Sequence, residues 1–281
     1  MNSKTGNRWF KLIFAGICLS AMLPVSCSAV FTFSNSNLVA INSDVSPPTK
    51  AVPYPSSLGV AGLNGLVVAK VTVTLYGFSH SFPSDVDVLL VGPLGQRAIL
   101  MANAGGQDRY SVTNLTLVFD DDATNSLPLF TSLVSGVFKP TNGYLDPYFG
   151  YSSLPFNFPS PAPPGNSNSP SVLSVFKNTD PSGTWNLFVV SDVTGDSGVI
   201  SNGWSLNLSV AVPLQIIQSQ TNVVISWPAS VTNGQLQSSP ALLPGANTWT
   251  NVSTTPGSNA GRLNVTNPIL KGSAFYRLVT N

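Results

Sequence analysis

Residues 204–210 read Trp-Ser-Leu-Asn-Leu-Ser-Val, a strict alternation of apolar and small polar side chains. Successive side chains of a β-strand point to opposite faces, so this run predicts a strand with one buried face. Residues 71–75 and 115–119 have apolar side chains at the same period of two. Turn-forming clusters separate such runs, as in residues 92–95 (GPLG) and 180–183 (DPSG). The pattern predicts an all-β fold of short strands, either a β-sandwich or a jelly roll.

The composition supports this fold class. The chain has 281 residues with a formal net charge of +1, and only 8% of them are charged, against about 25% in typical soluble domains. Ser, Asn and Thr together contribute 84 residues, and all 11 acids are Asp. The absence of Glu and the abundance of turn and cap formers argue against a helical bundle. Because there is no basic excess, we expect no nucleic-acid partner.

The N-terminus has the pattern of an export signal. Lys4, Arg8 and Lys11 precede an apolar stretch at residues 12–25, and small residues follow at 27–29. Residues 1–29 are therefore predicted to be a signal peptide, and the protein is expected to be secreted or on the cell surface. After cleavage, nine basic and eleven acidic residues remain, a net charge of −2.

The N-terminus has two alternative interpretations, a transmembrane anchor and a lipid anchor. A transmembrane anchor needs about 20 apolar residues, and the stretch at 12–25 is shorter than that. Lipidation at Cys27 would anchor the protein instead, but Pro24 fits the sequence expected before a lipidated cysteine poorly. We expect no transmembrane span in the mature chain.

A change of composition near Pro213 predicts two domains. No acid follows Asp196, and residues 214–281 carry only Arg262, Lys271 and Arg277 as charges. We expect a jelly-roll domain at 30–212, with Trp185 and Trp204 in its core. A small β module of fibronectin-like or immunoglobulin-like shape is expected at 213–281, with Trp227 and Trp249 in its core. Its role is open, and an adhesive or sorting tail is one interpretation.

Two sequence blocks resemble the P domain (P/Homo B domain) of subtilisin-like proprotein convertases. Residues 77–96 (GFSHSFPSDVDVLLVGPLGQ) are similar to the family's His-then-Asp-strand-Pro-x-Gly element. Residues 181–192 (PSGTWNLFVVSD) are similar to its Gly-x-Trp-strand-Asp element, and residues 203–206 resemble its closing strand. The resemblance covers residues 31–211, about two thirds of the mature chain.

This resemblance implies a jelly-roll sandwich with a non-catalytic role, the stabilisation of an adjoining serine endopeptidase and an association with proteolysis. The chain departs from that setting because it contains no protease domain. Its only histidine, His80, lies inside the P-like block, and no nucleophile loop accompanies it. A serine-protease triad needs three separate motifs, so we expect no catalytic residues. A secreted protease is the first expected partner, and a cell-surface glycan or protein is the alternative.

The acidic residues predict a calcium site. Asp85 and Asp87 are two residues apart and share a face with Leu89 and Val91, so Asp87 is expected to be at least partly buried. A buried carboxylate needs a hydrogen bond, a paired charge or a metal. The candidate Ca²⁺ ligands are Asp85, Asp87, Asp120, Asp121 and Asp192. The alternative is that Asp87 caps backbone amides and the other aspartates shape turns.

Residues 141–170 form a long segment rich in Pro, Gly, Asn and Ser with interspersed aromatic residues. We expect it to lie across a sheet. Its aromatic residues are also the basis of an alternative function, a sugar-binding surface on an adhesin or carbohydrate-binding protein. The aromatic residues in question are Tyr144, Tyr148, Phe149 and Tyr151, and Phe156 and Phe158 follow them in the same segment.

Overall fold

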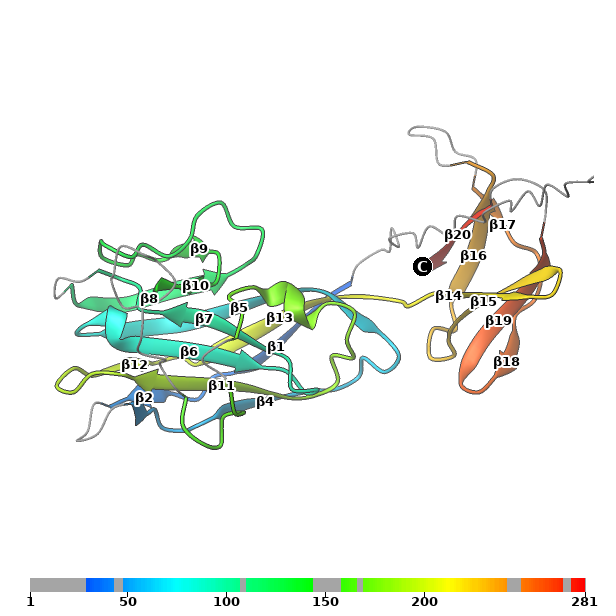
Figure 1. Ribbon diagram of the computed structural model, residues 1–281. Coiled ribbons are helices and arrows are strands. Elements are labelled where there is room, and N and C mark those ends of the chain that lie inside the picture. The colour runs from blue at the N-terminus through cyan, green and yellow to red at the C-terminus, as the bar shows by residue number, and fades with distance from the viewer. Residues whose placement is uncertain are drawn as a thin grey trace, which may run out of the picture.

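The computed structural model describes residues 29–42, 48–106, 110–143, 158–165, 169–241, 249–269 and 274–280. Almost all of the regular structure is β (Figure 1). The predicted signal peptide, residues 1–29, lies outside the described residues except for its last position. Within the described ranges, no helix is both long and apolar enough to cross a bilayer.

The first seven-stranded sheet is built around one long strand, β5. Its strand order is β1-β13-β5-β12-β2, with β8 also pairing with β5 and β9 pairing with β8. The strands are β1 (Ala29–Asn35), β2 (Val39–Ile41), β5 (Val67–His80), β8 (Val112–Phe119), β9 (Gly136–Phe138), β12 (Gly198–Ile200) and β13 (Trp204–Ala211). The stretch at 204–210 that predicted a strand is therefore β13, and it pairs with both β1 and β5.

A six-stranded sheet faces the first one. Its order is β10-β7-β6-β11-β3, with β4 pairing with β11. The strands are β3 (Thr49–Lys50), β4 (Ser56–Val60), β6 (Val86–Val91), β7 (Arg97–Ala102), β10 (Thr141–Asn142) and β11 (Gly183–Ser191). The described residues next to these strands include the short 3-10 helices η1 (Pro83–Asp85) and η5 (Leu173–Phe176).

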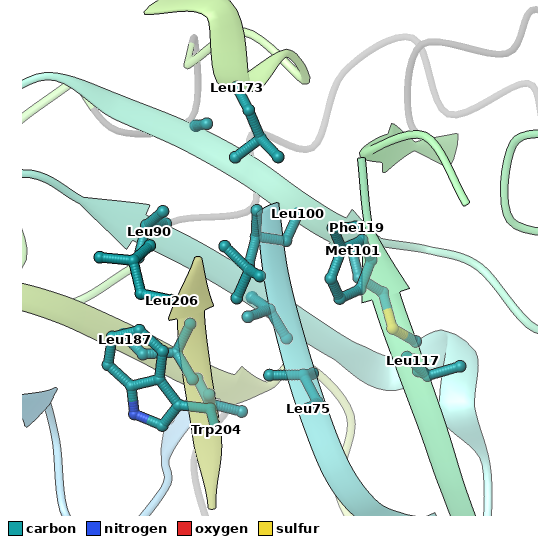
Figure 2. Close-up of a cluster of buried hydrophobic side chains, with 14 of the residues drawn as sticks. Leu75, Leu90, Leu100, Met101, Leu117, Phe119, Leu173, Leu187, Trp204 and Leu206 are labelled. Carbon is teal, nitrogen blue, oxygen red and sulfur yellow. The ribbon is translucent and has the colours of Figure 1, made fainter. Parts of the chain in front are cut away.

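The main hydrophobic core lies between these two sheets. Figure 2 shows Leu75 and Leu206 from one sheet beside Leu90 and Leu187 from the other. Both tryptophans expected in this core are fully buried, and each indole N–H has an acceptor: Trp185 donates to the Pro181 carbonyl at 2.9 Å and Trp204 to Ser56 Oγ at 3.0 Å. The prediction for these two residues is confirmed.

The six-stranded sheet is also buried on its outer face. Phe158 and Ala162 pack against Leu89 and Phe188 there, in a cluster that also contains Val91, Ile99, Ala102 and Val190. The Tyr54 hydroxyl donates to the Pro159 carbonyl at 2.9 Å and holds this covering segment, residues 158–165, in place. Every residue of β6 is consequently buried. The expectation that the long segment crosses a sheet is confirmed for residues 158–165.

The C-terminal strands form two further sheets. A four-stranded sheet has the order β14-β15-β19-β18, and a three-stranded sheet has the order β17-β16-β20. The strands are β14 (Gln215–Ser219), β15 (Asn222–Pro228), β16 (Gly234–Ser239), β17 (Thr250–Asn251), β18 (Gly257–Asn259), β19 (Arg262–Pro268) and β20 (Phe275–Thr280). A separate core lies between them, centred on Trp227 with Ile225, Val265, Leu236 and Leu278.

The structure confirms the predicted all-β fold of packed sheets and corrects one core residue. Trp249, expected in the second core, is only half-buried and stacks on the guanidinium group of Arg277. It precedes the two-residue strand β17 at the edge of its sheet, where the sheets do not enclose it. Strands of the first two sheets come from residues 29–211 and those of the last two from 215–280. The domain boundary at residues 212 and 213 itself stays a prediction.

Candidate functional site

Three of the five predicted calcium ligands gather at one end of the six-stranded sheet. Asp85 is the last residue of η1, Asp87 lies in β6 opposite Val190 of β11, and Asp192 directly follows β11. The Asp192 backbone N–H donates to the Asp85 carbonyl at 2.8 Å. Antiparallel pairing of β6 with β11 therefore joins carboxylates that are about a hundred residues apart in sequence. We call Asp85, Asp87 and Asp192 the acidic cluster.

Asp87 is the most deeply buried member. Its side chain has no exposed surface, and neither carboxylate oxygen has a well-formed hydrogen bond to a described residue. Burial raises the pKa of Asp87 well above its ordinary value, and the charges of Asp192 and then Asp85 raise it further. The Asn103 backbone N–H opposes this increase. The expectation of a buried Asp87 is confirmed, because Asp87 shares the covered face of β6 with Leu89 and Val91.

The acidic cluster offers some of the oxygen ligands that a cation such as Ca²⁺ needs. Ca²⁺ takes about six to eight oxygen ligands, and three carboxylates supply up to six. The two Asp87 oxygens are buried acceptors without a well-formed hydrogen bond, and a cation would satisfy them. Within the described ranges, however, no three His, Cys or Asp side chains already converge on one point as a formed metal site. Cation binding would therefore have to draw the carboxylates closer together.

Asp120 and Asp121 lie at the opposite end of β5 from the acidic cluster. Asp120 pairs with Lys70 Nζ at 2.8 Å, and Lys70 also pairs with Asp122 at 2.6 Å. Because β5 rises about 3.3 Å per residue, Lys70 lies roughly 30 Å from His80, which leads into η1. One ion cannot bind at both ends. The structure therefore separates Asp120 and Asp121 from the other three candidates.

Asp120 and Asp121 accept backbone N–H groups and shape turns, which is the alternative to a role as calcium ligands. The Asp121 carboxylate accepts the backbone N–H groups of Leu173 and Ser174, both at 2.7 Å, at the start of η5. Asp120 Oδ1 accepts the backbone N–H of Asp122 at 2.9 Å and so shapes the turn after β8. Both carboxylates are occupied by protein donors.

His80 is enclosed at the end of β5. Its side chain is buried, and Nδ1 accepts the Phe82 backbone N–H at 3.1 Å. Burial lowers the pKa of His80, outweighing the Phe82 hydrogen bond and the charge of Asp196, which both raise it. Asp196 itself accepts a hydrogen bond from Ser81 Oγ at 2.8 Å. A base needs contact with a nucleophile and with an orienting acid, and the contacts of His80 supply neither.

Sequence reasoning did not include Asn103 among the site residues. Asn103 follows β7 with a φ of 46°, a left-handed conformation that Asn adopts more readily than most residues. Its side-chain Nδ2 is buried without an acceptor, and its backbone N–H acts on Asp87. The pairing of β7 with β6 places the Ala104-Gly105-Gly106 turn, which follows Asn103, beside the acidic cluster.

The proposed sugar-binding aromatics are Tyr144, Tyr148, Phe149 and Tyr151, and all four lie outside the described residues. Phe158, a later aromatic residue of the same segment, is buried against the outer face of the six-stranded sheet. Its ring is a packing element and offers no surface to a ligand.

Comparison with known proteins gives no family. No family model matches the chain, and no curated protein does so either. Among solved structures, the crystal structure of an Aeromonas sobria serine protease in complex with a chaperone aligns with 64% of this chain and 27% of that chain, at 12% identity and a TM-score of 0.26. Similarity at that level carries no argument about this protein.

Proposed function

We propose that this chain is an exported, non-catalytic P-domain-like protein that stabilises or docks on a secreted serine endopeptidase of the subtilisin-like class. Two sequence blocks that resemble the P domain support this role. The acidic cluster would bind a structural Ca²⁺, and the chain would contribute to proteolysis only through its protease partner.

The observation that carries the proposal is the position of those two blocks. The first contains β6 and the second contains β11, and these strands pair directly at the centre of the six-stranded sheet. Leu90 lies opposite Leu187, and Asp87 lies opposite Val190. Both blocks therefore belong to one structural unit that contains the acidic cluster and Trp185. Both blocks resemble the P domain in sequence, and both contribute strands to the same unit. This supports the descent of residues 31–211 from a P domain.

The contacts of the only histidine favour a non-catalytic role. His80 is buried, and its Nδ1 is engaged by the backbone. One hollow lies beside Lys70 and Asp121, and another lies in the C-terminal sheets. Neither includes His80. A substrate would have no approach to this residue without rearrangement of the surrounding strands.

Calcium would act here as a structural ligand. A cation at Asp87 would neutralise the charge that burial and the neighbouring acids make costly. Asp85 belongs to the 3-10 turn before β6, and Asp192 belongs to the loop after β11. An ion held by all three would fasten this turn to this loop and stiffen the end of the sheet.

The experiment pairs the mature protein with a secreted subtilisin-like protease that lacks its own P domain. We expect the protein to lengthen the thermal half-life of the protease in calcium and to hydrolyse no peptide substrate alone. Hydrolysis by the pure chain that is lost in His80→Ala would overturn the non-catalytic role. If the protein leaves every such protease unaffected but binds cell-surface glycans, the adhesin or carbohydrate-binding alternative replaces the proposal.

A further inference from the structure

The four-stranded C-terminal sheet has an unprotected edge. Among the strands that the structure describes, β14 pairs only with β15, and all five of its residues are exposed. An open edge presents backbone N–H and C=O groups that can pair with another strand, and proteins usually protect such edges with charges, proline, bulges or a short strand. β14 contains no charged residue and no proline, and its register with β15 is regular.

The other edge strands of the C-terminal sheets are less open to pairing. β18 and β17 have only three and two residues, and β20 contains the charged Arg277. β14 also offers apolar surface, because the side chains of Ile216 and Ile217 are 38% and 58% exposed. It is therefore the edge of these sheets best suited to accept another strand.

The protein holds β14 in place from its paired side. Arg262 Nη2 donates to the Pro213 carbonyl at 3.2 Å, just before the strand begins, and to the Ser226 carbonyl at 2.8 Å. Ser226 lies opposite Gln215 in the register. The start of β14 is thus fixed to β15 and β19, and little conformational entropy is lost when a further strand pairs with it.

The register shows which backbone groups face the open edge. The Thr221 carbonyl accepts an N–H from the residue after β19, so it points toward β19. These directions alternate along an antiparallel strand, so the N–H and C=O of Val224, three residues later, point toward β14. Val224 lies opposite Ile217, which is therefore bonded to β15. The N–H and C=O groups of the two neighbours, Ile216 and Gln218, face the open edge.

A second copy of β14 complements these groups. In antiparallel pairing about a two-fold axis at Ile217, the backbone groups of Ile216 meet those of Gln218 of the second copy, and the axis repeats the contact. Ile217 then faces its own counterpart on the outer side of the sheet, next to Val224. Residues 214–261 contain no charged side chain, so the two edges meet without repulsion and without burying an unpaired charge.

We infer that the mature chain forms a two-fold symmetric dimer in which the two four-stranded C-terminal sheets join through β14 into one continuous sheet. The dimer places two copies of the N-terminal sandwich on one scaffold. The inference concerns assembly, so it does not depend on what the sandwich binds or on whether the acidic cluster takes up calcium.

Sedimentation velocity of the mature chain over a concentration series tests the dimer. An edge-to-edge contact is small, so we expect a Kd of roughly 1–100 μM. Ile217→Lys sets two like charges opposite each other on the axis and should raise this Kd at least about tenfold. Leu94→Lys is the matched control, because it adds the same charge at a similarly exposed apolar residue in the turn between β6 and β7. It should leave the Kd unchanged, and melting temperatures should show that both variants fold.

Cysteine substitution tests the register. Cys18 and Cys27 both lie within residues 1–29, so the mature chain has no cysteine of its own. Opposite residues of a non-hydrogen-bonded pair have Cα atoms about 4.5 Å apart, which is within the range of a disulfide. Ile217→Cys should therefore cross-link the dimer under mild oxidation. Gln218→Cys is also exposed, but it lies opposite Ile216 of the second copy and should not cross-link.

Three results would overturn the inference: a mature chain that stays monomeric at every concentration, an unaltered Kd in folded Ile217→Lys, or equal cross-linking of the two cysteine variants. If the chain is monomeric and Ile217→Lys instead abolishes binding of a secreted protease, that protease occupies the edge and a second copy does not.

Discussion

Replacement of Asp87 by Asn should change stability in opposite directions with and without calcium. The substitution keeps the shape of a fully buried side chain and removes its charge. A buried polar group without a partner costs about 1–3 kcal/mol, and a charged one costs more. Asp87→Asn should therefore stabilise the calcium-free protein by at least about 1 kcal/mol at pH 8. For a chain of this size, that raises the melting temperature by roughly 2–4 °C.

In the presence of calcium, the wild type should instead be more stable than Asp87→Asn. A ligand at a hundred times its Kd stabilises the folded state by about 2.7 kcal/mol, or roughly 5–10 °C in melting temperature. The wild type should gain this increment and Asp87→Asn should lose most of it. The assay is thermal melting followed by circular dichroism, in chelator and over a calcium titration. If the wild type melts at the same temperature in both, or if Asp87→Asn keeps the full calcium shift, the assignment of the site is wrong.

Without calcium, the free energy of unfolding should depend on pH more steeply in the wild type than in Asp87→Asn. The pKa of Asp87 is raised in the folded state by burial, Asp192 and Asp85. Between the ordinary Asp pKa of about 3.9 and this raised pKa, the folded state therefore binds more protons than the unfolded state, and stability falls as pH rises. Urea denaturation over this window should show that fall in the wild type. A wild-type slope no steeper than that of Asp87→Asn would contradict the pKa shift.

Three further substitutions test the local structure. Asp121→Ala leaves the backbone N–H groups of Leu173 and Ser174 without an acceptor and should cost about 1–3 kcal/mol, while an intact calcium shift in thermal melts would confirm that Asp121 lies outside the site. Ser56→Ala removes the acceptor of the buried Trp204 indole N–H, and urea denaturation should show a loss of about 1–3 kcal/mol. Leu206→Ala opens a cavity between the two sheets and should cost about 2–5 kcal/mol in the same assay; a smaller loss would mean that the core collapses around it.

The all-β fold could be predicted from side-chain periodicity, because the alternation of apolar and polar residues in a strand shows which of its faces is buried. The run at 204–210 forms strand β13, as its alternating pattern indicates. The burial of Asp87 followed from the same reasoning, since Leu89 and Val91 share its face. Periodicity does not report which strand ends meet, because strand register is a long-range property.

The candidate site shows that limit clearly. Asp85, Asp87 and Asp192 come together because β6 pairs with β11, and no pattern within either strand indicates that pairing. Asp120 and Asp121 could not be excluded from the sequence, because their separation from the acidic cluster depends on the pairing of β5 with β8. Trp249 was misassigned to a core because alternation cannot tell an enclosed strand from one at the edge of a small sheet.

The covering segment at residues 158–165 makes the six-stranded sheet the middle of three layers. Opening energies in a native protein range from near zero for loops to the full stability for core strands. Release of this cover would uncover the outer side of β6 while its pairing with β7 and β11 stayed intact. Asp87 lies on that outer side, so ions could reach it by a local opening rather than by global unfolding. Calcium uptake should then share its rate and temperature dependence with the hydrogen exchange of the Ala162 amide, which bonds to the Pro159 carbonyl at 3.0 Å.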